Sequence, residues 1–293
     1  TAMKFKQLFK VAIYSVLLTF LAACSEIKSD VTSIRMAHTL DTQHPVHKGL
    51  EHMNQVLKEI SDGKMQLVIY PSGQLGSERE IIELLQIGSM GMTKVSASSL
   101  EAFVPEMKVF SLPYLFQDQT HFWQTLQGEI GQRLLDAGSL YRVKGLGYFD
   151  AGSRSFYTTK QKVEKPEDLN GLKIRVMNSQ SAVEMVNTIG GAATPVSFGE
   201  LYTALQQGIV AGAENNPPSF YLSRHYEVCK YYSIDEHTMI PDVLLVSTHL
   251  WNRLSSEEQG WLQKAIDQSI PYQRDLWIQS ENESLQAVIE AGV

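Results

Sequence analysis

Cysteine is scarce in this chain: only Cys24 and Cys229 occur among its 293 residues. A framework of several disulfides is therefore excluded, and the hydrophobic core must hold the fold together. Because 43% of the residues are apolar, the chain is long enough to bury one large core or two smaller ones.

A basic excess is also missing, since 25 lysines and arginines face 32 acidic residues and the net charge is −7. Three of the lysines lie within residues 1–23, so the remainder has 22 basic and 32 acidic residues and a net charge of −10. Nucleic-acid binding needs a basic surface, and we expect no nucleic-acid partner. An anionic small ligand stays compatible, because local arginines decide the charge of a pocket.

Three enzyme motifs are absent from the sequence. It contains no Gly-x-Ser-x-Gly elbow, no Gly-x-x-x-x-Gly-Lys phosphate loop and no Gly-x-Gly-x-x-Gly dinucleotide motif. We therefore expect a protein that is not an enzyme and needs no cofactor. A hydrolase attached to a membrane by lipid is the less favoured alternative.

Residues 1–23 have the pattern of an export signal, with a cloning scar before Met3. Lysines and no acidic residue occupy the first part, and residues 11–23 form an apolar run too short to span a bilayer. Leu-Ala-Ala-Cys at residues 21–24 resembles the lipobox of bacterial lipoproteins, in which the cysteine becomes the lipidated first residue. We expect a location in the periplasm or on the outer face of the cell membrane, with lipid anchoring to the membrane through Cys24. The alternative is an ordinary signal peptide with an incidental cysteine.

From Ile34 onward, helix-like and strand-like segments alternate, which predicts the α/β class. Ser77 and Glu80 form a capping box that opens a further helix, and Pro271 predicts a break or kink in the last one. The expected helices are residues 46–60, 118–137, 182–189, 199–206 and 255–290, and the expected strands are residues 65–70, 91–97, 143–149, 155–158, 172–176 and 211–214.

Two α/β sets joined by more than one crossing predict two lobes with a ligand cleft between them, as in periplasmic binding proteins. We expect residues 24–151 plus 240–280 in the first lobe and residues 152–239 plus 281–293 in the second.

Several ordered segments make residues 34–261 resemble the substrate-binding proteins of tripartite ATP-independent periplasmic (TRAP) transporters. The segments are residues 70–76 (YPSGQLG), 111–116 (SLPYLF), 166–176 (PEDLNGLKIRV), 193–196 (ATPV), 200–206 (ELYTALQ) and 212–216 (GAENN). The resemblance implies a two-lobed fold that closes on an organic acid and delivers it to membrane permease subunits driven by an ion gradient.

The resemblance also implies which residues bind the ligand. Arg175, in the Lys-Ile-Arg-Val strand, would grip the ligand carboxylate, since a guanidinium offers paired planar donors. Arg154 matches a second arginine of the family, and Asn215 matches an asparagine that supports the carboxylate. The family pattern further implies five softer contacts, namely Glu78, His38, Asn178, Phe198 and His237. Family members usually continue past residues 290–293, so we expect the final inter-lobe helix to be incomplete here.

The ligand prediction follows from the branch of the family that the chain resembles. Residues 152–157, 199–202, 214–217, 224–228 and 235–237 look most like the uronate branch. We therefore predict a hexuronate, either glucuronate or galacturonate, with a C4-dicarboxylate or another organic acid as the alternative.

A metal site is a further alternative, because His38, His44 and His47 are close in sequence. Structural zinc usually needs four closely spaced ligands, and no cysteine is free to join these three histidines. We therefore predict no metal.

Overall fold

The computed structural model describes residues 31–293. Ser33–Val293 forms one compact unit, and its first strand begins one residue earlier, at Thr32. The expected export signal and Cys24 lie outside the described residues. Among residues 31–293, no helix combines the length and the apolar character that crossing a membrane requires.

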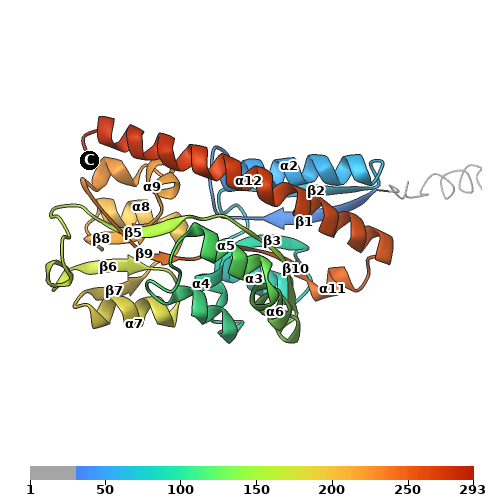
Figure 1. The fold of residues 1–293 in the computed structure, drawn as a ribbon, viewed down its shortest axis with the longest axis horizontal. Helices are drawn as coiled ribbons and strands as arrows, with labels where there is room; N and C mark the ends of the chain where they lie inside the picture. The colour runs from blue at the N-terminus through green and yellow to red at the C-terminus, as the bar shows by residue number, and fades with distance from the viewer. Residues whose placement is uncertain (1–30) are drawn as a thin grey trace, which may run out of the picture. The chain divides into compact units, whose positions relative to one another are not determined.

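Five strands form the first sheet, in the order β2-β1-β3-β10-β4 (Figure 1). β1 and β3 run parallel, whereas β10 runs antiparallel to both β3 and β4. The strands are β1 Thr32–Ala37, β2 Met65–Tyr70, β3 Met92–Ser96, β4 Val143–Phe149 and β10 Asp242–Ser247. The helices beside this sheet in the sequence are α2 Pro45–Ile60, α3 Glu78–Gln86, α4 Ala97–Leu100, α5 Gln119–Gln127, α6 Glu129–Ala137 and α11 Thr248–Trp251, with 3-10 helices at Pro105–Ser111 and Gly138–Tyr141.

Five further strands form the second sheet, in the order β7-β6-β8-β5-β9. β6 is parallel to β7 and β8, and β5 is antiparallel to β8 and β9. The strands are β5 Ser153–Thr158, β6 Lys173–Val176, β7 Ala192–Pro195, β8 Gly212–Asn215 and β9 Tyr231–Met239. The remaining helices are α7 Gln180–Thr188, α8 Phe198–Gln206, α9 Pro217–Leu222, α10 His225–Val228 and α12 Ser256–Glu290, with a 3-10 helix at Pro166–Leu169. The α/β class is confirmed.

Local signals in the sequence explain where the two helices nearest the site begin. Pro45 opens α2 after His44, whose Nδ1 accepts a hydrogen bond from the Val46 backbone N–H at 3.3 Å. The predicted capping box of α3 is confirmed: the Ser77 backbone N–H donates to Glu80 Oε2 at 2.7 Å, and the Glu80 N–H donates to Ser77 Oγ at 3.4 Å.

The expected single helix over residues 118–137 is wrong, because α5 and α6 are separate helices that meet at Gly128. Gly128 ends α5 and begins α6 with an extended backbone at φ −87° and ψ −173°. The chain turns tightly there: a Cβ on Gly131 would lie 1.9 Å from the Leu126 carbonyl oxygen. The apolar period continues across the turn, which is why the periodicity alone predicts one helix.

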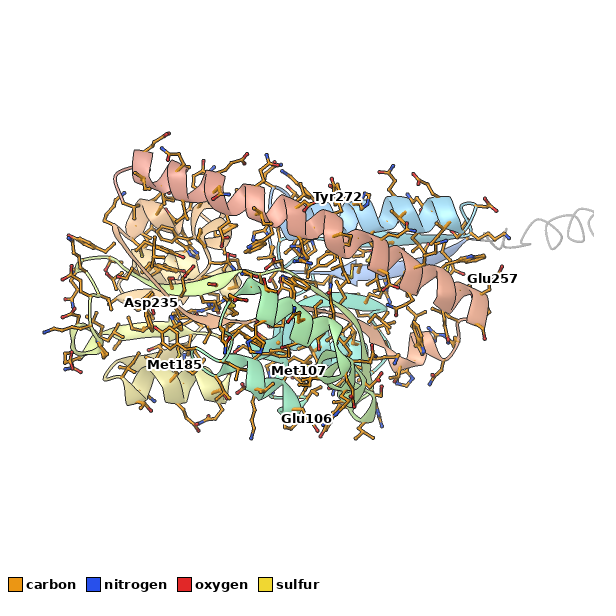
Figure 2. All side chains as sticks on the ribbon, in the orientation of Figure 1. Glu106, Met107, Met185, Asp235, Glu257 and Tyr272 are labelled. Atoms are coloured by element: carbon orange, nitrogen blue, oxygen red, sulfur yellow. The ribbon has the colours of Figure 1, made fainter. Side chains whose placement is uncertain are left out.

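The expected break at Pro271 does not occur, since α12 runs without interruption from Ser256 to Glu290. It packs on α2, β4 and α9 (Figure 1), and these contacts hold the helix on both sides of the proline. The next residue, Tyr272, stacks on His52 of α2 with ring centroids 3.9 Å apart (Figure 2). The lobe boundaries stay a prediction, because Ser33–Val293 forms one compact unit and the boundary expected at residue 280 falls inside α12.

Candidate binding site

One cavity, called the main cavity below, gathers most of the side chains that the sequence singles out. With its open mouth included, it encloses about 830 Å³. Two of the predicted contacts, His38 and His237, are not part of its lining. The other six line it: Glu78, Arg154, Arg175, Asn178, Phe198 and Asn215.

Three adjacent strands of the second sheet bring Arg154, Arg175 and Asn215 together. β8 lies between β5 and β6, and Asn215 is its last residue. Asn215 is paired with Ser155, the neighbour of Arg154, and Arg175 is paired with Ala213 of the same central strand. Residues far apart in sequence therefore reach one cavity because sheet pairing places them side by side.

Arg175 is a buried cation without an acidic partner. Its side chain donates from Nε to the Val196 carbonyl oxygen at 2.8 Å, and its Cζ lies 6.0 Å from the centroid of the Phe198 ring. Its Nη1 has no hydrogen-bond partner, and no ion pair of residues 31–293 includes it. Burial lowers the pKa of Arg175, because the charged form has lost its water. A carboxylate in the cavity would satisfy both the orphan donor and the charge.

Arg154, in contrast, is largely engaged within the protein. Its Nε donates to Glu214 Oε2, and its Nη2 donates to Glu214 Oε1 at 3.0 Å and to the Glu214 carbonyl oxygen at 2.7 Å. Its Nη1 donates to Asn215 Oδ1 at 2.9 Å. A guanidinium has five N–H donors, so a single Nη1 hydrogen is left for a ligand. Arg154, the second arginine predicted to bind the ligand carboxylate, can thus donate at most one hydrogen bond to it.

His237 supports this arrangement from outside the main cavity. Its Nδ1 lies 2.8 Å from Asp235 Oδ2, its Nε2 lies 3.8 Å from Glu214 Oε2, and its ring stacks on Phe156 at 4.5 Å. Burial opposes a charge on this imidazole, but the two carboxylates outweigh burial and raise its pKa. Burial likewise opposes the Glu214 charge, yet Arg154 and His237 lower the pKa of that carboxyl to about 2. His237 therefore lies behind Glu214 and outside the cavity lining, and its predicted contact with the ligand stays a prediction.

His237 and Asp235 also line a second cavity with Met185 of α7, and Figure 2 labels Asp235 and Met185 on the side of the second sheet. Tyr114, which also lines this second cavity, lies in the loop between the 3-10 helix at Pro105–Ser111 and α5, and its backbone N–H donates to the carbonyl oxygen of His237 in β9 at 2.8 Å.

The first sheet supplies an opposite wall of the main cavity, and two of its charged residues were not predicted. Lys94 Nζ of β3 lies 3.0 Å from Asp242 Oδ2 and 3.5 Å from Glu78 Oε1, and all three residues line the cavity. The Ser96 backbone N–H also donates to Glu78 Oε1 at 3.2 Å, which leaves Glu78 Oε2 free to accept from a ligand. Burial opposes the Lys94 charge, but the two carboxylates raise its pKa. One feature of the sequence could have indicated this group of charged residues, namely the lysine inside the buried strand at residues 92–96.

The predicted role of His38 as a ligand contact is not supported by its position, because it is fully buried outside the lining. His38 Nδ1 accepts from the Leu40 N–H at 3.2 Å, so its Nε2 carries the proton and faces His47 Nδ1 at 2.9 Å. His47 Nε2 in turn lies 3.4 Å from Glu51 Oε1. Burial, with Lys94 and His47 adding to it, lowers the pKa of His38 to about 3. Hydrogen bonds and an ion-pair contact with neighbouring groups thus account for the positions of His38 and His47.

His44 lines the main cavity, although the sequence pointed to it only as a metal ligand. Its Nδ1 accepts from the Val46 N–H, so its Nε2 is the donor toward Ser219 Oγ at 3.3 Å. Burial and the charge of Lys94 keep its pKa well below the usual range. Within residues 31–293, no group of three or more histidine, cysteine or acidic side chains is placed to hold a metal ion.

Three of the predicted contacts keep polar or apolar surface available for a ligand. Asn215 Oδ1 accepts from Arg154 and from the Asn216 backbone N–H at 2.9 Å, which turns its Nδ2 donor away from these partners. Asn178 is exposed after β6, and Phe198 is half-buried at the start of α8. The cavity therefore combines one free cation, amide donors and an apolar ring.

Comparison with known families places this arrangement among transport proteins. The sequence profile described as bacterial extracellular solute-binding protein, family 7 (DctP) matches residues 36–293. The chain is also similar to the C4-dicarboxylate-binding periplasmic protein DctP of Rhodobacter capsulatus, with 29% identity over 88% of this chain and 78% of the relative.

Solved structures share the fold at higher identity. A TRAP periplasmic solute-binding protein from Bradyrhizobium sp. BTAi1, in complex with α/β-D-galacturonate, is 42% identical, with a TM-score of 0.87 over 89% of this chain and 87% of that one. Another from Anaerococcus prevotii, with bound α/β-D-glucuronate, is 36% identical, with a TM-score of 0.87 over 89% and 85% of the two chains. The predicted two-lobed fold is confirmed by these likenesses.

Proposed function

We propose that this chain, which belongs to family 7 of the bacterial extracellular solute-binding proteins, binds a hexuronate such as galacturonate or glucuronate in the main cavity. As a TRAP solute-binding protein it captures a small organic acid for membrane permease subunits. Proteins of this family are substrate-binding components of transporters and not enzymes.

The observation that carries the proposal is the unpartnered Nη1 of Arg175. A buried guanidinium without a counter-charge costs free energy unless an anion joins it. A ligand carboxylate could accept from Arg175 Nη1, from the remaining hydrogen on Arg154 Nη1 and from Asn215 Nδ2. Each charge-assisted hydrogen bond contributes about 1.5–3 kcal/mol. Together these bonds would supply much of the binding free energy of about 8 kcal/mol that micromolar affinity needs.

The rest of the cavity supports a polyhydroxylated ligand. Glu78 Oε2 and the Asn178 amide could accept from or donate to ring hydroxyls, and Phe198 offers an apolar face. The solved relatives that hold galacturonate and glucuronate support the same ligand class. The relative named for C4-dicarboxylates makes a dicarboxylate the alternative within the family.

Release and capture would follow a hinge motion of two lobes, with residues 24–151 plus 240–280 in one and residues 152–239 plus 281–293 in the other. Arg175 lies on β6 of the second sheet, whereas Glu78 begins α3 and is hydrogen-bonded to Ser96 of β3 in the first sheet, so a ligand held by both would favour the closed state.

A thermal-shift screen of the purified chain tests the ligand. A ligand that binds only the folded state adds about 2.7 kcal/mol of stability at a concentration of a hundred times Kd. We expect galacturonate or glucuronate to raise Tm, and sialic acid and C4-dicarboxylates to raise it less. A shift with succinate alone would replace the hexuronate by the alternative. The absence of a shift with every acid, in protein shown by mass spectrometry to carry no ligand, would refute the proposed function.

Lipid anchoring through Cys24 is a separate proposal, which rests on the Leu-Ala-Ala-Cys pattern alone. We expect the parent protein in the membrane fraction and Cys24→Ser in the soluble fraction after cell fractionation. Cys229→Ser is the matched control, since this buried thiol should not affect the distribution. A parent protein that is already soluble would contradict the anchor and leave the binding function intact.

A further inference from the structure

The two walls of the main cavity carry opposite excess charge. On the first-sheet wall, the single charge of Lys94 faces two carboxylates, Glu78 and Asp242, at 3.5 Å and 3.0 Å. On the second-sheet wall, Glu214 neutralises Arg154, and Arg175 stays uncompensated. One wall therefore has one negative charge in excess, and the other has one positive charge in excess.

Other charged groups near the cavity do not change this balance. Arg79 lines the mouth but is exposed, and its Nε pairs with Glu83 of the same helix at 3.2 Å. His237, behind Glu214, is balanced by Asp235. The two walls face one ligand volume, because Glu78, Asp242 and Arg175 all line the same cavity.

We propose that Glu78 and Asp242 determine specificity by repelling a second carboxylate, so that the cavity selects sugar acids with one carboxylate over diacids of the same size. The inference rests on the proposed function, because it takes the first carboxylate to lie at Arg175. The far end of the ligand then meets the first-sheet wall, where hydroxyl groups can donate to the free carboxylate oxygens. A second carboxylate there would place like charges together in a buried site, where screening by water is weak.

Two compounds separate charge from shape in this test. L-Galactonate and galactarate are both open-chain acids with the same carbon chain and the same four secondary hydroxyl groups, and they differ at one end only, where galactonate carries a CH2OH group and galactarate a second carboxylate. Isothermal titration of the whole chain with both compounds should show L-galactonate binding at least about a hundredfold tighter than galactarate. A dicarboxylate without hydroxyls, succinate, should bind more weakly still.

Glu78→Gln and Asp242→Asn are the test variants, because each keeps the shape and removes one negative charge. Each should lower the preference for L-galactonate over galactarate by at least about tenfold. Glu106→Gln is the matched control: it makes the same change at an exposed position that does not line the cavity and takes part in none of the ion pairs among residues 31–293, and it should keep the preference of the parent.

The outcomes distinguish the inference from the function on which it rests. A parent protein that binds both acids equally would overturn the specificity role and leave the binding function standing, as would variants that keep the parental ratio. A parent protein that binds no hexuronate would overturn the proposed function first. If Asp242→Asn fails to fold because Lys94 loses its closer partner, Glu78→Gln alone decides, since Lys94 keeps Asp242 at 3.0 Å in that variant.

Discussion

At the residue scale, the two arginines that the sequence treats alike have different roles in the structure. Four N–H donors of Arg154 are hydrogen-bonded to Glu214 and Asn215, whereas Nη1 of Arg175 has no hydrogen-bond partner. A guanidinium that is already saturated holds other groups in place, whereas one with an orphan donor can bind. We therefore propose Arg175 as the main anchor of the ligand, with Arg154 orienting Asn215 beside it.

Replacing this anchor should remove most of the affinity. We expect Arg175→Ala to weaken hexuronate binding by at least about a hundredfold, since one or two charge-assisted hydrogen bonds are lost. Arg175→Lys should recover only part of it, because an ammonium cannot make a paired planar contact. Isothermal titration measures both variants.

Arg133→Ala, an exposed position on α6, serves as the control and should bind like the parent. If Arg175→Ala and Arg133→Ala both bind the hexuronate as tightly as the parent, the ligand carboxylate lies elsewhere in the cavity.

At the element scale, α12 is the segment whose behaviour the sequence described least well. A proline within a helix removes a backbone donor and crowds the preceding turn, at a cost of about 3 kcal/mol. The helix nevertheless continues through Pro271, because packing on α2 before it and on α9 after it stabilises both halves. Tertiary contacts have overridden local propensity here.

Replacing the proline should reveal this conflict. We expect Pro271→Ala to raise the free energy of unfolding by about 1–3 kcal/mol, measured by urea denaturation. Asp275→Ala, at an exposed position of the same helix, reports on helix propensity alone and should change stability by less than about 1 kcal/mol. A loss of stability in Pro271→Ala would show instead that the contacts of the proline ring outweigh its cost to the helix.

At the scale of the whole molecule, burial of neutral histidines makes the fold sensitive to acid. Burial lowers the pKa of His38 and that of His225 to about 3 each, and it holds the pKa of His44 well below its usual range. Between pH 6.5 and pH 3 the unfolded chain therefore binds protons that the folded chain does not. His237 does not oppose this trend: its raised pKa gives a contribution that is fully present below pH 6.5 and is lost only as pH rises through the folded value.

The free energy of unfolding should accordingly fall by about 1.4 kcal/mol per pH unit for each of these three histidines as pH drops below 6.5. Glu281, whose pKa burial raises to about 7, offsets one of the three down to its ordinary value of 4.5, so the net slope is that of about two groups. Guanidinium denaturation at pH 7, 6 and 5 measures the slope. The variant His38→Gln should show a shallower slope than the parent. Equal midpoints at pH 7 and pH 5 in the parent would contradict the prediction.

Much of the fold could be predicted from local pattern. The alternation of segments predicted the α/β class, and Ser77 with Glu80 predicted the start of α3, because a capping box depends on residues three apart. Four strands were missed, namely β1, β7, β9 and β10. Of the last two, β9 carries charged residues such as Asp235 and Glu236, and β10 follows Pro241. Only their pairing with β5, β3 and β4 makes them strands.

The sequence by itself determined the α/β class, the chain's low cysteine content and, through ordered motifs, the six candidate residues that line one cavity. These properties depend on residues near one another in the chain. Only the tertiary structure decided that Lys94 and Asp242 join Glu78, that Glu214 saturates Arg154, and that His38 and His237 stand behind the cavity wall. Hydrogen bonding and ion pairing act over about 3–4 Å in space. The partners can be as far apart in the chain as Lys94 and Asp242, so they become known only when the strands are placed.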